Sequence, residues 1–256
     1  MLFLFFVAIF AMFITHIASM RIFSVYQWII AAPIIVVLTI LTAIVTAVGS
    51  MLFGGRLWGY YPPHFWAKCW CWLLFVRVKV EGRENVDKNV SYVFVANHQG
   101  AYDIFSIYGF LGHNFKWMMK KSLEKVPFVG FACRCAGHIM VDRSSAAAIK
   151  LTMSTAKSRL RNGVSLVVFP EGTRSHTGKM GTFKRGAFKL AGEFNLPIVP
   201  ITINGSYDVL PRTTYQIRPG RITITLHKPI PPERGLDHAM STCFESIRSA
   251  LDEKYK

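Results

Sequence analysis

The first 55 residues are almost continuously hydrophobic and form two long apolar runs. The run at 1–20 has no ionisable side chain except His16, and the run at 28–53 is longer still. A helix of about 20 apolar residues is long enough to cross a bilayer, and neither run has the polar face of a helix at the surface of a soluble domain. We therefore predict a two-helix membrane anchor. It forms either a hairpin around RIFSVYQ (21–27) or a pair in which one helix lies in the interface.

Charged residues become frequent only after these runs. All 14 acidic residues lie at or after Glu81, and Arg21 is the only lysine or arginine before Arg56. Because basic residues that flank membrane spans tend to stay on the cytoplasmic side, this asymmetry predicts that the rest of the chain is cytoplasmic. The segment 56–73 is rich in Tyr and Trp, residues typical of a bilayer interface. We predict an anchor at 1–55 and an interfacial connector at 56–73.

From residue 74 to residue 256 strand-like segments alternate with helix-like ones, which predicts one α/β domain. The fold class that we expect is a central, mixed but mostly parallel sheet flanked by helices and preceded by the anchor. The expected strands are VRVKVEG, VSYVFVAN, FKWMMK, HIMVD, SLVVFPEG, PIVPITING and RITITLHKP. The expected helices cover 103–111, 144–161, 185–194 and 236–255.

Composition narrows the possible partners. A net charge of +16 suits nucleic acid, anionic lipid or an anionic substrate. No nucleic-acid-binding module is recognisable, so with an apolar N-terminus present we expect anionic membrane lipid and no nucleic acid. The five cysteines show neither C-x-x-C spacing nor a disulfide framework. We therefore expect a reducing compartment and no bound metal.

One polar cluster follows the expected strand VSYVFVAN. His98 comes directly after the strand, and Asp103 lies five residues further on, at the start of an expected helix. Sites in α/β sheets collect at the carboxyl ends of strands. A carboxylate that holds one imidazole nitrogen leaves the other free to act as a base. On local evidence alone, Asp103 is equally well explained as a helix cap beside an ordinary loop histidine.

A second cluster, PEGTR, follows the expected strand SLVVFPEG. Gly172 permits close approach of the backbone, and Arg174 can bind a phosphate through two parallel hydrogen bonds. A surface pair of Glu171 and Arg174 in a turn is the alternative. The chain has no nucleotide-binding glycine loop and no G-x-S-x-G nucleophile motif. A base without an evident protein nucleophile suggests direct activation of a hydroxyl on the substrate.

Four ordered blocks resemble the glycerolipid acyltransferase family. They are NHQGAYD (97–103), GHIMVDR (137–143), FPEGTRS (169–175) and VPITING (199–205), and the segment KKSLEKVPFVG (120–130) is also similar. The resemblance spans roughly residues 75 to 230. It implies an acyltransferase of phospholipid biosynthesis that uses acyl-CoA or acyl carrier protein to acylate lysophosphatidic acid, with no cofactor. It also implies a place at the bacterial cytoplasmic membrane, with the active site on the cytoplasmic face.

The resemblance assigns roles to individual residues. His98 is expected to remove the proton of the acceptor's sn-2 hydroxyl, and Asp103 to orient His98. The other residues expected at the substrate are Glu171, Gly172, Thr173, Arg174, Lys120, Lys121 and Arg143. Arg174 is expected to face the acceptor's phosphate, and Pro200 to shape the acyl-chain tunnel. The chain departs from the family pattern at Gly100, where serine is common.

Three other functions remain open from the sequence. The first is a related acyltransferase with another lysolipid acceptor. The second is a lipid-binding membrane protein without catalysis, against which the intact His98 and Asp103 pair argues. The third is a metal-dependent phosphohydrolase, which would have to recruit further ligands such as His138 and Asp142.

Overall fold

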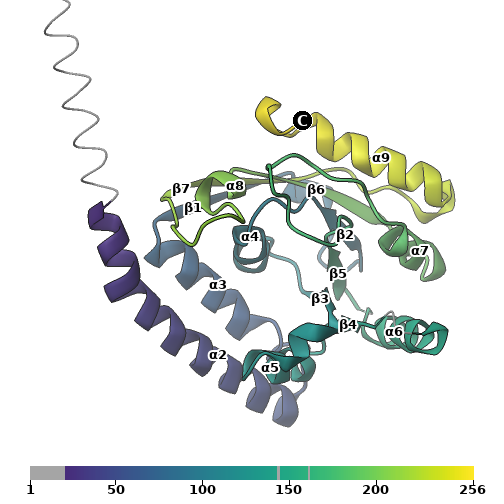
Figure 1. Ribbon diagram of the computed structural model, residues 1–256. Helices are drawn as coiled ribbons and strands as arrows, with labels where there is room; N and C mark the ends of the chain where they lie inside the picture. Colours follow the sequence, from purple (N-terminus) through teal and green to yellow (C-terminus); the bar gives the residue numbers. More distant parts are fainter. Residues whose placement is uncertain (1–20, 143–144, 161) are drawn as a thin grey trace, which may run out of the picture.

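A central sheet organises the molecule, and its strands come from the alternating segments of the sequence. The computed structural model describes residues 21–142, 145–160 and 162–256. Within these residues, seven strands form one sheet in the order β1-β7-β6-β2-β5-β3-β4 (Figure 1). Their bounds are β1 Val76–Glu81, β2 Val93–Ala96, β3 Phe115–Lys120, β4 Ile139–Val141, β5 Ser165–Val168, β6 Ile198–Asn204 and β7 Gly220–Leu226. Only the β6–β7 pair is antiparallel.

Helices cover both faces of this sheet and give three layers. They are α2 Ala32–Phe53, α3 Tyr61–Leu73, α4 Tyr102–Phe110, α5 Val129–Cys135, α6 Ala146–Arg159, α7 Gly186–Glu193, α8 Ser206–Val209 and α9 Leu236–Ser249. One face packs against α3 and α4, with Tyr102 and Phe105 in that core. The other face packs against α6, α7 and α9 through residues such as Phe188 and Ile247. Figure 1 shows α9 and α3 on opposite sides of the sheet.

The central strands are apolar because they are covered on both faces. All four residues of β2 and of β5 are buried, as expected for parallel strands between two helical layers. The residues of β7 alternate instead between buried and partly exposed. The buried centre therefore fixes β2 and β5, and the loops that follow these two strands start from rigid positions.

The observed elements confirm the predicted fold class. All seven expected strands are present, and the four expected helices are found as α4, α6, α7 and α9. The last helix ends earlier than expected, at Ser249. The Asn204 side chain terminates it by donating to the carbonyl oxygen of Ala250 at 2.8 Å and accepting from the Asp252 N–H at 3.0 Å. The helix α3 lies within the segment predicted to be a connector.

The N-terminal region differs from the predicted hairpin. Residues Arg21–Phe53 form one continuous helix, so the loop expected at 21–27 is wrong. The segment 21–27 contains neither glycine nor proline that would interrupt a helix. The first expected helix, at 1–20, lies outside the described residues. In the described part of the chain this is the one helix long and apolar enough to cross a membrane.

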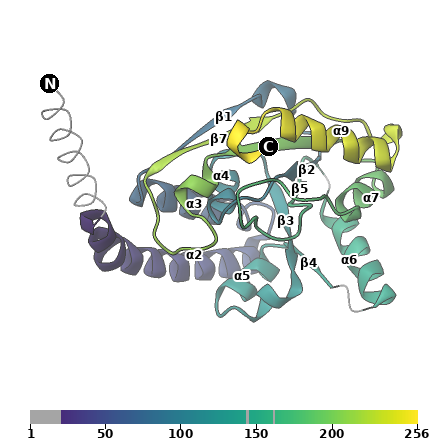
Figure 2. The same cartoon turned by 45° about the horizontal axis from the view of Figure 1, so that its top comes forward.

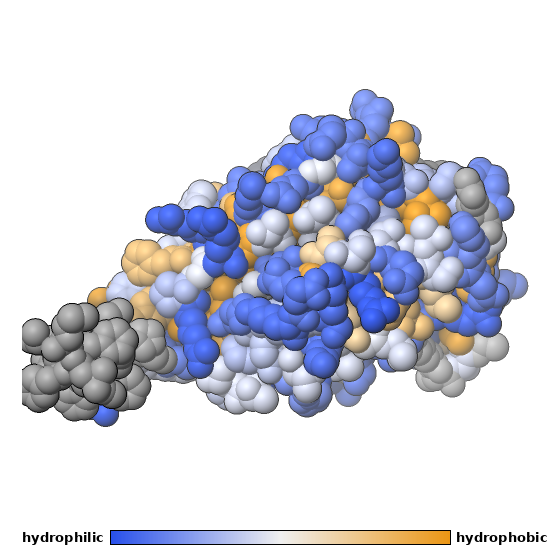
Figure 3. Space-filling model, turned by 90° about the horizontal axis from the view of Figure 1, so that it is seen from above, coloured by the Kyte–Doolittle hydropathy of each residue, from blue (hydrophilic) through white to orange (hydrophobic). Residues whose placement is uncertain are grey.

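This helix is packed along the domain on one side and exposes apolar residues on the other. Ala43, Ala47 and Ser50 are buried, and α2 lies beside α3 and α5 (Figure 2). Apolar side chains such as Ile29 and Phe53 are about 70% exposed. Hydrophilic side chains cover most of the face seen from above, and smaller hydrophobic patches are scattered between them (Figure 3).

A buried lysine joins the end of this helix to the sheet. Lys116 of β3 donates from Nζ to the carbonyl oxygens of Gly55, just after α2, and of Ala136, just after α5, at 2.7 and 2.8 Å. Burial and, to a smaller extent, the nearby charge of Arg159 together lower the pKa of Lys116 to about 8. A cation at two helix carboxyl ends is favourable because the last carbonyls of a helix carry partial negative charge.

The turn between α2 and α3 gives a test of this packing. A Cβ at position 59 would lie 2.4 Å from the carbonyl oxygen of Gly55 and 2.6 Å from that of Ala136. Gly59→Ala should therefore lower the free energy of unfolding by about 1–3 kcal/mol through overpacking. Gly192→Ala is the matched control, because a Cβ there meets no atom within 4 Å. Thermal unfolding in detergent micelles compares the two, and equal melting temperatures would contradict the packing described.

Candidate active site

Asn97 anchors the turn that carries His98. Its side-chain amide donates from Nδ2 to the carbonyl oxygen of Ile203 at 2.9 Å, and its Oδ1 accepts from the N–H of the same residue at 2.8 Å. Asn97 is fully buried. The amide thus continues the pairing of β2 with β6 beyond the last strand residue and fixes where the next residue begins.

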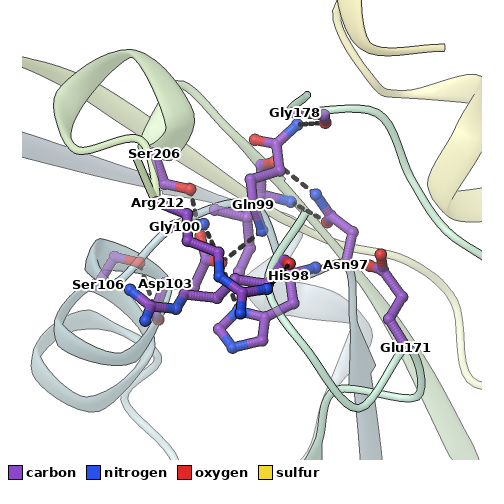
Figure 4. A network of polar contacts seen from close by, with 12 residues as sticks. Asn97, His98, Gln99, Gly100, Asp103, Ser106, Glu171, Gly178, Ser206 and Arg212 are labelled. Carbon is purple, nitrogen blue, oxygen red and sulfur yellow. Dashed lines mark hydrogen bonds and ion pairs between the residues drawn. The ribbon is translucent and has the colours of Figure 1, made fainter. Parts of the chain in front are cut away.

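The buried Asp103 carboxylate accepts four hydrogen bonds. Its Oδ2 lies 2.7 Å from His98 Nδ1, and it also accepts from the backbone N–H groups of Gln99 at 2.7 Å and Gly100 at 2.9 Å. Its Oδ1 accepts from the Ser206 hydroxyl. Figure 4 shows these groups around the carboxylate. Because the carboxylate accepts a hydrogen bond from Nδ1–H, the free lone pair of the neutral His98 imidazole is at Nε2.

Aromatic rings fix the plane of the His98 imidazole. Phe169 stacks on it with ring centroids 3.9 Å apart and planes inclined by 9°. Trp117 stacks on Phe169 in turn, at 5.6 Å. The His98 side chain is 12% exposed. The ring therefore cannot turn away from Asp103 without breaking the stack, and little of it remains open to a substrate.

Glu171, in the turn that follows β5, supports the turn that carries His98. Its Oε1 accepts from the His98 backbone N–H at 2.8 Å, and its Oε2 accepts from the Gly181 N–H at 2.8 Å. Burial raises the pKa of Glu171, and these two hydrogen bonds oppose the increase. The carboxylate is thus engaged with the backbone on both oxygens, which favours a positioning role over the substrate contact predicted from the sequence.

The PEGTR turn lies directly against the histidine turn. The Ser175 N–H donates to the carbonyl oxygen of His98 at 2.8 Å. Arg174 is therefore the neighbour in sequence of a residue that contacts His98 directly. Arg174 is half-buried and forms no ion pair with any residue that the structure describes. Gly172 has a φ of 75°, and a Cβ there would lie 2.6 Å from Lys184 Nζ. Two cations therefore flank this turn.

The predicted lysines lie further along the same edge of the sheet. Lys120 ends β3 and is exposed, and Lys121 Nζ forms an exposed ion pair with Asp142 Oδ2 at 2.6 Å. The strand order places β5 between β2 and β3. The structure thus unites His98 with the PEGTR turn. The two lysines follow β3, which pairs with β5 but not with β2. The predicted Arg143 lies outside the described residues.

Two contributors to the site were not predicted from sequence. Ser206, which bonds Asp103, follows the VPITING block directly. Arg212 donates from Nη1 to Thr173 Oγ1 at 3.0 Å and to the carbonyl oxygen of Arg174 at 3.2 Å. The position of Ser206 after a motif block was a usable signal. Arg212 lies in a loop without a motif, and nothing in the sequence marked it.

The metal-dependent alternative finds no support in the described residues. No group of three or more His, Cys, Asp or Glu side chains there is arranged to hold a metal ion. His138 is buried, and its Nδ1 accepts from the Trp117 N–H at 3.2 Å while its Nε2 lies 3.3 Å from the Tyr108 hydroxyl. Burial lowers the pKa of His138 to about 3, so this ring is a neutral structural group.

Comparisons with known proteins identify the family of the chain. A family model described as acyltransferase matches residues 77–204. A Chlamydomonas reinhardtii protein named 1-acyl-sn-glycerol-3-phosphate acyltransferase is 32% identical over 233 residues, which are 90% of this chain and 68% of that protein. The crystal structure of the 1-acyl-sn-glycerophosphate (LPA) acyltransferase PlsC from Thermotoga maritima is also similar. It has a TM-score of 0.71 and 27% identity, covering 91% of this chain and 94% of that one.

A plant relative matches a shorter part. The chloroplastic 1-acyl-sn-glycerol-3-phosphate acyltransferase LPAT1 of Arabidopsis thaliana is 33% identical over 172 residues, or 65% of this chain. The chain spans about half of that protein, 48% of its length. The residues matched by the family model, 77–204, include both turns described above.

Removal of the Ser206 hydroxyl tests the support of Asp103. In Ser206→Ala the buried Oδ1 loses its donor, and because a hydrogen bond to a charged group contributes about 1.5–3 kcal/mol, kcat should fall about tenfold or more. Ser106→Ala is the matched control. Its hydroxyl is also buried but donates to the Asp103 backbone carbonyl at 3.1 Å, not to the carboxylate. Equal kcat values for the two variants would show that the Ser206 contact does not matter.

Restoration of the family's common serine should impair this chain. A Cβ at position 100 would lie 2.9 Å from the carbonyl oxygens of both Ser206 and Leu210. Gly100→Ser should therefore displace α8, weaken the Ser206 contact and lower kcat. Gly100→Ala should do the same, since the obstacle is the Cβ and not the hydroxyl. If Gly100→Ser matches or exceeds wild type in kcat, the close approach of α8 is wrong.

Proposed function

The chain belongs to the acyltransferase family of enzymes, and from this premise we propose that it acylates the sn-2 hydroxyl of lysophosphatidic acid to make phosphatidic acid. The donor is a thioester, either acyl-CoA or acyl carrier protein. The observation that carries the proposal is the 2.7 Å contact between His98 Nδ1 and Asp103 Oδ2 beside the Arg174 turn. It supports a base for a hydroxyl next to a cation for a phosphate.

The proposed reaction is a direct transfer. His98 Nε2 takes the proton of the acceptor's hydroxyl while the hydroxyl oxygen attacks the carbonyl carbon of the thioester. Asp103 stabilises the imidazolium that forms, as an orienting carboxylate does in other His–Asp sites. The carbon–sulfur bond then breaks, and the leaving thiolate takes the proton from His98. The products are the new ester and the free thiol, and the base returns to its starting form.

The acceptor's phosphate is proposed to bind at the PEGTR turn. Arg174 supplies a planar guanidinium that matches a phosphate through two hydrogen bonds, and it has no ion pair among the described residues. Lys184, which lies over Gly172, adds positive charge at the same turn. Bound there, the phosphate holds the acceptor beside His98, and this loss of freedom lowers the barrier of the following step.

The lipid parts of the acceptor are proposed to lie against the N-terminal helix. An apolar hollow of about 370 Å³ is lined by Trp28 and Ile35 of this helix, Trp70 of α3, Phe128, Leu210 and Tyr215. The Leu210 carbonyl oxygen lies over Gly100 in the histidine turn. On this proposal the hollow holds an alkyl chain of the acceptor, which reaches from the site to the exposed apolar side of the helix. On this proposal the helix rests in the bacterial cytoplasmic membrane, with the site on its cytoplasmic face.

Two other functions differ from this proposal, one in the acceptor and one in the absence of catalysis. A lysolipid with a larger head group would place a phosphate diester at Arg174. A diester carries less negative charge than a phosphate monoester. A non-catalytic lipid-binding protein would not need the four hydrogen bonds that hold the buried Asp103. The cost of burying an ionised carboxylate without need argues for catalysis.

The first experiment uses wild type and His98→Ala in liposomes that contain lysophosphatidic acid. Acyl-CoA and acyl carrier protein are supplied in separate reactions. Wild type should form phosphatidic acid, and the variant should lose about 100- to 10,000-fold in rate because it lacks the base. The melting temperature of His98→Ala confirms that it is folded.

Each outcome of this experiment decides a separate point. Product with only one donor identifies that donor. Full activity of folded His98→Ala would disprove the proposed base. If folded wild type forms no product with either donor, the acceptor is wrong, and a panel of other lysolipids becomes the next assay.

A further inference from the structure

The loop at 210–217 closes over the site from the side of α8. Its two ends are held together, since the Arg218 N–H donates to the carbonyl oxygen of Val209 at 2.9 Å. Compact loops of this kind, with adjacent ends, often have functional roles. Tyr215 at its tip is 85% exposed. The loop has two further attachments, one to the N-terminal helix and one to the PEGTR turn.

Gln27 attaches this loop to the N-terminal helix. Its Nε2 donates to the carbonyl oxygen of Tyr215 at 2.8 Å, and its Oε1 accepts from the Ile217 N–H at 2.9 Å. Ser24 adds a hydrogen bond to the side chain of Gln216 at 2.9 Å. Gln27 is only 4% exposed although it belongs to a helix of apolar composition. A buried amide in such a helix is costly unless paired, and here all its bonds go to one loop.

The N-terminal helix is locally wider where Gln27 bonds the 210–217 loop. Residues Tyr26–Ala31 form a π-helical turn, and Gln27 is one of its two buried residues. Such turns are rare in proteins and frequently occur at functional sites. The wider turn coincides with the point at which the helix hydrogen-bonds the 210–217 loop.

Arg212 attaches the same loop to the PEGTR turn. A single nitrogen, Nη1, bonds both Thr173 Oγ1 and the carbonyl oxygen of Arg174. The residues described by the structure offer Arg212 no ion pair, and its side chain is exposed. The remaining donors of the guanidinium are therefore available at the turn proposed for phosphate. Figure 4 places Arg212 in the same network as His98 and Asp103.

We propose that Arg212 is a second contact for the phosphate monoester of the acceptor, beside Arg174, and that Gln27 is a positioning residue for it. The inference rests on the proposed function and extends it. Gln27 fixes the 210–217 loop to the N-terminal helix, and the loop presents Arg212 to the head group. An acceptor that arrives from the bilayer along this helix meets its phosphate site at the level of the exposed Tyr215.

The test of Arg212 compares acceptors that differ only in the phosphate. Lysophosphatidic acid is a monoester, and its phosphate methyl ester carries one charge less. Arg212→Ala should raise the KM for lysophosphatidic acid about tenfold, as expected for loss of a charge-assisted hydrogen bond, and leave the donor KM within about twofold. Its preference for monoester over methyl ester should fall. Arg212→Lys should recover part of the affinity, because it keeps the charge but loses the planar fork.

Arg218→Ala is the matched control for charge. It removes one exposed cation that flanks the same loop. The acceptor KM, the donor KM and the preference for monoester over methyl ester should all stay unchanged. If Arg218→Ala raises the acceptor KM as much as Arg212→Ala, general attraction of anionic lipid explains the effect, and the contact is wrong. If Arg212→Ala slows both acceptors equally, its role is structural. If the donor KM rises instead, the guanidinium binds the donor's phosphate.

Gln27→Leu and Gln27→Asn test the positioning role. Both should raise the acceptor KM several-fold at unchanged donor KM, and the double variant with Arg212→Ala should be no worse than Arg212→Ala alone, since Gln27 acts through Arg212. Thr46→Val is the control on the same helix, because the buried Thr46 hydroxyl has no partner among the described residues. If the increases in acceptor KM of the two single variants add in the double variant, Gln27 does not act through Arg212, and its positioning role is wrong.

The failure of this inference is distinguishable from failure of the proposed function. Wild type that forms no phosphatidic acid refutes the function, whatever the variants do. Wild type that is active, together with Arg212→Ala of unchanged acceptor KM and unchanged monoester preference, refutes the inference alone. Melting temperatures of all variants in detergent separate a lost contact from a lost fold.

Discussion

The buried carboxylate of Asp103 is the group around which the site is built. An ionised carboxylate in an apolar interior is stable only when hydrogen-bond donors replace the water that it loses. Here the donors come from the imidazole, two backbone N–H groups of the histidine turn and the hydroxyl of Ser206. They belong to segments that follow β2 and β6, so a stable carboxylate requires that both segments stand in the observed positions. The same bonds that stabilise the anion also orient His98.

The sheet provides these positions because its central strands are parallel. The residues after β2 and β5 emerge at one edge, and pairing of β2 with both β5 and β6 brings three connecting segments together there. Glu171 links two of them, since its carboxylate bonds the backbone of His98 and of Gly181. Such cross-links make His98, the PEGTR turn and the following loop parts of one rigid unit. Positioning of this accuracy is what the proposed direct transfer between two bound substrates demands.

Much of this arrangement was predictable from local sequence. The central strands β2 and β5 are apolar runs with clear ends, β1 and β7 alternate between apolar and polar residues, and the polar residues after β2 and β5 mark the site. The roles of single residues were harder to predict. Glu171 reads as a ligand contact from its motif, but its two hydrogen bonds to backbone depend on Gly181, ten residues away in a loop. Arg212 approaches the turn only because α8 reverses the chain. The hairpin predicted at 21–27 failed because hydropathy shows length but not where a helix bends.

The N-terminal helix is part of the domain and not only an attachment to it. A helix serving solely as an anchor would need no polar contacts with the domain, since apolar side chains suffice to hold it in lipid. Arg21–Phe53 instead has Gln27 bonded to the 210–217 loop, Thr39 accepting from Trp66 Nε1 at 2.9 Å, and its end capped by Lys116. These bonds fix the distance from the apolar surface to His98. The proposed acceptor would have its tail in the bilayer and its phosphate in water, and its acylation would require that this distance be constant. Three polar contacts along one helix keep it so.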